Sequence, residues 1–248
     1  LGVGYLTASG QIDTAKSIYT SSKLTWLSGL IGSLLFGFGM VLASGCGSKT
    51  LVRIGGGSLK SLVVFLTLSL SAFMTIKGLF GVIRVSSVDT IFVTLSTTQD
   101  LPSIISASTG LAKSTLQLGL AAIFGGACLL FALSRKNFWN FNNLLAGVVV
   151  GGAIVAVWWI SGSLGYVAED PNTLEEVFVA TNTGRMESLT FVAPYAFFTE
   201  WLLFFSDASK KLTLGIVAVC GVVWGSALDA LGTRTFHGET VRIAEETA

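Results

Sequence analysis

Six apolar runs, each close to the length that crosses a bilayer, constrain the fold of this chain more than any other feature of its sequence. A membrane-spanning helix needs about 20 apolar residues, because the hydrocarbon core is about 30 Å thick. The runs are residues 24–44, 62–83, 116–133, 144–164, 189–205 and 212–231. Only 12% of the residues are charged, against about 25% in typical soluble domains. The sequence therefore predicts an all-α fold, a polytopic transmembrane helix bundle that forms a single membrane domain over residues 1–248.

A polar connection between the second and third runs contains apolar pieces that are too short to span. These pieces are residues 91–95 and 101–105, within the connection 84–115. Because lipid offers no hydrogen-bonding partner to exposed backbone groups, such pieces indicate short re-entrant or interfacial helices. Pro102 suits the first turn of a helix, where its missing N–H is tolerated. We therefore expect a short helix that begins near Pro102.

The charges in the other connections predict an orientation in the membrane. The connections after the first, third and fifth runs are basic, with Lys49, Arg53 and Lys60, then Arg135 and Lys136, then Lys210 and Lys211. The connection after the fourth run is acidic, with Glu169, Asp170, Glu175, Glu176 and Glu187 against a single Arg185. By the positive-inside rule, the three basic connections face the cytoplasm and the acidic connection faces out.

The cysteine and histidine content excludes several classes of protein. Cys46, Cys128 and Cys220 are far apart in the sequence, without a Cys-x-x-Cys pair, and His237 is the single histidine. This pattern predicts neither a metal site nor a disulfide framework, and it argues against a metalloenzyme. The net charge of +1 gives no support for nucleic-acid binding. We expect a protein that is not an enzyme and that uses no metal and no cofactor.

A polar, glycine-rich break follows the first apolar run and places Cys46 between Gly45 and Gly47. Such a break is costly in lipid, so it normally lines a cavity or a pathway. Glycine neighbours leave the thiol unshielded and let the backbone turn sharply, which exposes the sulfur and the amide groups to a passing solute. The break, including Ser48, is therefore the candidate site. A tight helix-ending turn would also explain the glycines, but it does not explain the thiol at the centre of the turn.

Cations follow the break at Lys49, Arg53 and Lys60, at intervals of four and seven residues. If the segment after Ser48 is helical, these side chains fall near one face of the helix. The amide groups at the start of that helix would add partial positive charge, and the arrangement suits a small anion. The alternative is a cytoplasmic loop whose cations merely follow the positive-inside rule.

Two acidic residues lie inside apolar runs. Glu200 lies well within the run 189–205, whereas Asp229 lies near the end of its run and within reach of Arg234. Intramembrane carboxylates commonly serve as proton relays. Glu200 is therefore a candidate proton relay.

Two stretches resemble a known family of membrane proteins. Residues 36–60, read as FGFGMVLASGCGSKTLVRIGGGSLK, and residues 221–237, read as GVVWGSALDALGTRTFH, carry the resemblance. They are similar to the YeeE/YedE family of bacterial inner-membrane sulfur transporters, whose studied members take up thiosulfate. The resemblance covers most of the chain and is specific around Cys46.

The resemblance implies a fold with a two-fold internal repeat, short re-entrant helices that meet near the midplane, and cysteine thiols along a narrow path. In the family, these thiols are thought to pass thiosulfate along by S–H hydrogen bonds to its terminal sulfur. Cys46 matches the cysteine of the family's first Gly-Cys-Gly motif, whereas Cys128 and Cys220 match no family motif. An earlier family cysteine and a later Gly-Cys-Thr motif have no counterpart between Leu1 and Ala248, so we expect a chain that is incomplete at both ends.

The resemblance and the residues together predict a multi-pass permease of the bacterial inner membrane for thiosulfate or a related small sulfur-containing anion. Cys46 would contact the substrate sulfur, Gly45 and Gly47 would allow close approach, and Lys49 and Arg53 would supply positive potential. One alternative is a transporter or channel for another solute, with Glu200 as proton relay. The other is a membrane subunit that transports nothing and binds a sulfur-carrier protein. The resemblance also implies a small soluble sulfurtransferase-like partner.

Overall fold

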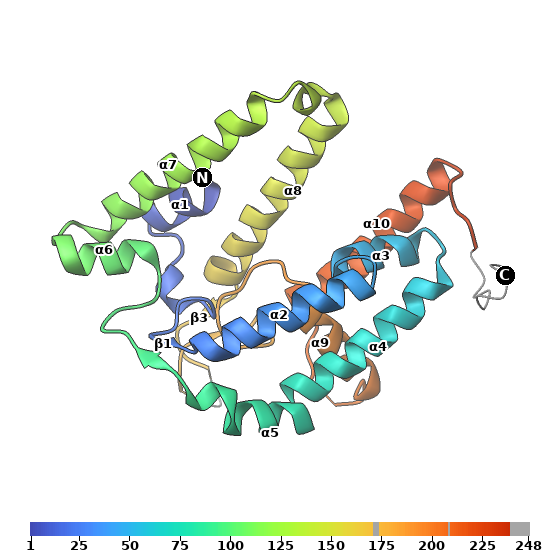
Figure 1. Ribbon diagram of the computed structural model, residues 1–248, viewed down its shortest axis with the longest axis horizontal. Coiled ribbons are helices and arrows are strands. Elements are labelled where there is room, and N and C mark those ends of the chain that lie inside the picture. The colour runs from blue at the N-terminus through green and yellow to red at the C-terminus, as the bar shows by residue number, and fades with distance from the viewer. Residues whose placement is uncertain (171–173, 208, 239–248) are drawn as a thin grey trace. The chain divides into compact units, whose positions relative to one another are not determined.

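The computed structural model describes residues 1–170, 174–207 and 209–238, and in them it is mostly helical (Figure 1). The predicted all-α fold class is therefore confirmed. The chain divides into two compact units, one made of Leu1–Leu24 with Val93–Leu189 and the other of Thr25–Phe92 with Thr190–Ala248. That the two units form one membrane domain stays a prediction.

The first unit contains the amino-terminal helix, a long helical hairpin and two short strand pairs. Its elements are α1 (Gly2–Ala8), η1 (Thr14–Lys16), β1 (Lys23–Leu24), β2 (Val93–Thr94), α6 (Leu101–Thr109), α7 (Lys113–Leu133), η3 (Lys136–Trp139), α8 (Phe141–Trp159), η4 (Ile160–Leu164), β3 (Tyr166–Val167) and β4 (Val177–Phe178). The strands pair antiparallel, β1 with β2 and β3 with β4. Leu6, Ile12, Phe178 and Met186 form the buried core of this unit.

Helix α6 confirms the short helix that the sequence predicts near Pro102. The Asp100 side chain caps the helix by accepting a hydrogen bond from the Ser103 N–H at 3.1 Å. Pro102 lies in the first turn, and Gly110 ends the helix with a φ of +71°. The capping carboxylate and the early proline explain why a helix begins here, since both suit only the start of a helix.

The second unit carries the break at Cys46 and is built from helices. They are α2 (Trp26–Leu42), α3 (Gly47–Gly55), α4 (Leu59–Ile76), α5 (Leu79–Ser86), η2 (Val88–Thr90), α9 (Val192–Leu203) and α10 (Leu214–Gly232). Helix α4 packs along α9, and α3 packs along α10. Leu51, Phe65, Tyr195 and Val219 form the core of the unit, with one residue from each of these four helices. The short helices α3 and α9 therefore lie between the longer α4 and α10.

Five helices in the described part of the chain are long and apolar enough to cross a membrane. They are Trp26–Gly55, which includes the break, and Leu59–Ile76, Lys113–Leu133, Phe141–Leu164 and Leu214–Gly232. The predicted run 189–205 differs, because it forms only the 12-residue α9, which is about 18 Å long. Pro194 lacks an N–H and is tolerated only in the first turn, so the helix cannot begin much before Val192. Helix α9 is therefore too short to cross a membrane alone.

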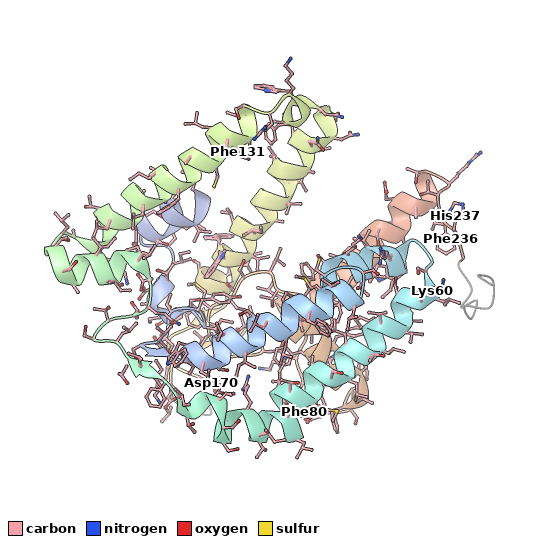
Figure 2. The ribbon with its side chains drawn as sticks, in the orientation of Figure 1. Lys60, Phe80, Phe131, Asp170, Phe236 and His237 are labelled. Atoms are coloured by element: carbon pink, nitrogen blue, oxygen red, sulfur yellow. The ribbon has the colours of Figure 1, made fainter. Side chains whose placement is uncertain are left out.

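The ion pairs around Glu200 bear on the predicted orientation of Lys210. Lys60 is in the first turn of α4, whereas Lys77 caps the other end, about 25 Å away at 1.5 Å per residue. Lys77 and Lys210 both bind the carboxylate of Glu200. Figure 2 shows Lys60 at one end of α4, with Phe80 beyond the other end. If α4 crosses the membrane, Lys60 and Lys210 lie on opposite sides, and the prediction that both face the cytoplasm is wrong.

Site-directed labelling should detect this arrangement. We expect cysteines introduced as Lys60→Cys and Ser209→Cys to react with a membrane-impermeant maleimide from opposite sides of sealed vesicles, because both positions are exposed and flank opposite ends of α4. The parent chain, with its own three cysteines, supplies the background labelling. Labelling of both introduced cysteines from the same side would contradict the arrangement.

Candidate functional site

The break between α2 and α3 has a backbone that requires glycine. Ser44 has a φ of +55° and Gly45 a φ of +155°, so two successive residues leave the helical conformation. A Cβ on Gly45 would lie 2.7 Å from the Cδ of Lys49. Cys46 then caps α3 in an extended conformation, with φ −80° and ψ 170°. The segment after Ser48 is helical, as part of α3, which is the condition under which the sequence analysis considered a cationic helix face.

Cys46 lines a small cavity of about 180 Å³ at this break. The other lining residues come from α2, the break, α3, α4 and α9, and they are Leu35, Phe36, Gly39, Met40, Ala43, Gly45, Gly47, Thr50, Val64, Leu68 and Val192. Cys46 and Thr50 are the polar side chains among them. The structure thus places Cys46 in a cavity whose walls are apolar apart from Thr50.

The surroundings of the sulfur favour negative charge. The Cys46 Sγ lies 3.1 Å from the Ser48 Oγ, and Cys46 is the N-cap of α3, so the backbone amides of Ser48 and Lys49 follow it within three residues. These amides belong to the first turn of α3, where unpaired N–H groups give a helix its partial positive charge. An anion beside the sulfur would therefore meet hydrogen-bond donors on one side and apolar walls on the other.

Tyr195 of α9 is a site residue that the sequence analysis missed. Its hydroxyl donates a hydrogen bond of 2.5 Å to the carbonyl oxygen of Gly47, and the residue is 0% exposed. Its ring packs against Phe65 of α4, with centroids 4.6 Å apart. A tyrosine inside an apolar run normally indicates packing or an interface, so the sequence contains no signal for this contact.

The two cations of the predicted site lie outside the cavity. Lys49 and Arg53 are both exposed, and neither is among the lining residues. Arg53 is in the last turn of α3, where a cation stabilises the negative end of the helix dipole. The structure therefore brings together Cys46, Gly45, Gly47 and Ser48, and leaves the role of Lys49 and Arg53 as a prediction.

Glu200 binds two lysines. Its carboxylate, in a residue that is 5% exposed, accepts hydrogen bonds from Lys77 Nζ at 2.7 and 2.8 Å and from Lys210 Nζ at 2.6 Å. The hydrogen bond to Glu200 is the main cause that raises the pKa of Lys210, so the contact favours the charged form of this lysine. Two cations on one carboxylate stabilise its ionised form. The geometry favours a permanent ion cluster, and proton transfer by Glu200 stays a prediction.

The other two cysteines, Cys128 and Cys220, are not among the residues that line the cavity at the break. Cys128 is exposed on α7 of the first unit, and Cys220 is half-buried on α10. Within residues 1–170, 174–207 and 209–238, no group of three or more His, Cys, Asp or Glu side chains could hold a metal ion. The chemistry of the site therefore rests on the thiol, the hydroxyls and the backbone amides near Cys46.

Almost the whole chain matches one known family. The family model described as Sulphur transport matches residues 1–247. No curated protein matches the chain. The family match takes in both compact units, and it includes the break at Cys46, Tyr195 and the ion cluster of Glu200.

Proposed function

Because this chain belongs to the Sulphur transport family (YeeE/YedE), we propose that it is a permease for thiosulfate or a related small sulfur-containing anion, and that its Cys46 thiol contacts the substrate sulfur. Family membership makes the chain a transporter of a sulfur compound, which indicates that it is not an enzyme. Its long apolar helices make it a multi-pass membrane protein. We further propose that this membrane is the bacterial inner membrane.

The position of Cys46 in the cavity at the break carries the proposal. The thiol is a soft, polarisable group with a weak S–H donor, and it suits a terminal sulfur better than water does. The mostly apolar walls would limit competition by water, and a hydrogen bond is stronger in such surroundings. The Ser48 hydroxyl and the amides of α3 would hold the negative charge, so the anion is bound without a full countercharge.

The size of the cavity agrees with a small solute. A cavity of about 180 Å³ compares with a share of about 30 Å³ for one water molecule in the liquid. It therefore has room for an ion of a few heavy atoms. Gly45 and Gly47 both line the cavity. Lys49 fills the space beside Gly45, and Tyr195 and Phe191 fill the space beside Gly47, so close approach of the ion over these two glycines stays a prediction.

Uptake of radiolabelled thiosulfate by liposomes that contain the full chain tests the proposal. We expect Cys46→Ala to lower uptake at least about tenfold, because a lost hydrogen bond to a charged group costs about 1.5–3 kcal/mol. Cys128→Ala is the matched control, since Cys128 is exposed on α7 of the other unit, and its uptake should equal that of the parent. Equal uptake by Cys46→Ala and the parent would overturn the proposal.

We also propose a small soluble sulfurtransferase-like protein as a partner, and the family resemblance alone supports it. Affinity purification of the chain from membranes, followed by identification of bound proteins, tests this contact. The same preparation separates two functions. Capture of such a carrier together with zero uptake by the parent in liposomes would favour a subunit that binds the carrier and transports nothing.

A further inference from the structure

We propose that Tyr195 is the positioning residue for the Cys46 thiol: its hydroxyl fixes the carbonyl group of Gly47 and so sets where the sulfur lies in the cavity. This inference rests on the proposed function, because it assigns to Tyr195 a role in substrate affinity. It concerns a residue on α9, which is 148 positions from Gly47 in the sequence.

The break has few other ties to the rest of the second unit. Its backbone hydrogen bonds are local: the N–H groups of Ser44 and Gly45 donate to carbonyl oxygens of α2, at Val41 and Met40. The carbonyl oxygen of Cys46 accepts from Thr50 of α3. These backbone hydrogen bonds join the break to the two helices beside it. The hydroxyl of Tyr195 joins the first residue of α3 to a third helix.

Helix α9 and its N-cap residue lie close to Gly47 at this hydrogen bond. A Cβ on Gly47 would lie 3.4 Å from the Tyr195 hydroxyl oxygen and 3.5 Å from the Cβ of Phe191. Gly47 follows Cys46 directly, so a movement of its carbonyl by a few tenths of an ångström moves the sulfur as well. A hydrogen bond of 2.5 Å between fully buried groups restrains such a movement.

Tyr195 can act as a fixed point because α9 is itself held on several sides. Its ring lies against Phe65 of α4. Pro194 packs so closely on α10 that a Cβ on Gly215 would lie 2.8 Å from the proline Cγ. At the other end of the helix, Glu200 binds Lys77 and Lys210. A donor on an element restrained in this way holds its acceptor in one place, as a precise binding site requires.

The substitution Tyr195→Phe removes the hydroxyl and keeps the ring. We expect the thiosulfate concentration for half-maximal uptake to rise about five- to tenfold, with the maximal rate within about twofold of the parent, as for one lost buried hydrogen bond. Thr199→Val is the matched control: it removes another α9 hydroxyl, which bonds the Tyr195 carbonyl oxygen at 3.0 Å and does not touch Gly47. For Thr199→Val, the thiosulfate concentration for half-maximal uptake should stay within about twofold of the parent value, since the hydrogen bond of Thr199 is local to α9.

Two further measurements separate positioning from folding. In a Cys46→Ser chain, adding Tyr195→Phe should change the half-maximal concentration by less than about twofold, because residues that act through one contact are not additive. Replacement of Tyr195 by 4-aminophenylalanine, which keeps a donor at the same ring position, should restore the parent value. Protein in the membrane is quantified for every variant.

The outcomes distinguish this inference from the proposed function. Parent-like uptake by Tyr195→Phe, with uptake lost in Cys46→Ala, would overturn the role of Tyr195 and leave the proposed function standing. If Tyr195→Phe had its full effect in the Cys46→Ser chain, the role of Tyr195 would be overturned too. The same holds if Tyr195→Phe fails to reach the membrane while Thr199→Val reaches it. Parent-like uptake by Cys46→Ala would instead remove the proposed function.

Discussion

Gly55→Ala is expected to prevent the second unit from folding normally, although it adds a single methyl group. A Cβ at this position would overlap the Ser226 Oγ and would lie 2.6 Å from the carbonyl oxygen of Val223 and 2.8 Å from the backbone nitrogen of Ala227. A side chain can rotate away, but the backbone atoms belong to α10 and cannot move without moving that helix. Overpacking of a core costs about 1–3 kcal/mol, and contact with the backbone of a second helix puts this case at the upper end or above it.

The neighbouring glycine supplies the control for this prediction. Gly56 has a right-handed helical conformation, with φ −72°, and the nearest atoms to a Cβ there are 3.5 and 3.7 Å away. Gly56→Ala should therefore leave the protein close to its parent in stability. The measurement is the yield of monodisperse protein in mild detergent and its midpoint of thermal unfolding. Equal midpoints for Gly55→Ala and the parent would show that α3 and α10 do not pack as closely as the structure has them.

Glu200→Ala is the second substitution for which we expect a large effect. It leaves Lys77 and Lys210 without the carboxylate that joins the end of α4, α9 and the segment before α10. Removal of one partner of a buried ion pair costs about 3–5 kcal/mol, but the lysine side chains are 45% and 31% exposed and can turn to water. We therefore expect a loss of about 2 kcal/mol, read as a lower midpoint of thermal unfolding in detergent.

An exposed ion pair in the other unit serves as the control for Glu200→Ala. Glu176 pairs with Lys16, and both side chains are substantially exposed. Exposed pairs contribute little to stability, because water and salt screen the charges. Glu176→Ala should leave the unfolding midpoint unchanged. Equal effects of the two substitutions would mean that the cluster around Glu200 does not tie these helices together.

The substitution Glu200→Gln addresses proton transfer separately. A relay must gain and lose a proton, whereas two lysines at 2.6 to 2.8 Å hold the carboxylate in its ionised form. If the cluster is permanent, uptake by Glu200→Gln should keep the pH dependence of the parent, even where the protein is less stable. Loss of that pH dependence in Glu200→Gln would instead support the alternative in which Glu200 relays protons.

Hydropathy and glycine content predicted much of the fold, because both properties depend on residues that are close together in the sequence. Helices α7, α8 and α10 lie within or close to the predicted apolar runs, and α6 begins where Pro102 indicates. The run 189–205 is different, since its apolar length suggests a crossing while Pro194 restricts where a helix can begin. Its short helix α9 then places Lys210 at the end of α4 opposite Lys60, which counting charges in connections could not reveal.

The sequence by itself determined that this chain is a helical membrane protein of the Sulphur transport family, with a thiol between two glycines at a break after its first apolar run. These properties depend on neighbouring residues. Only the tertiary structure decided that Tyr195 holds Gly47, that two lysines bind Glu200, and that Lys49 and Arg53 lie outside the cavity. The first two join residues up to 148 positions apart, and the third depends on which face of α3 turns inward. Such facts follow from how whole helices pack, and no local pattern encodes them.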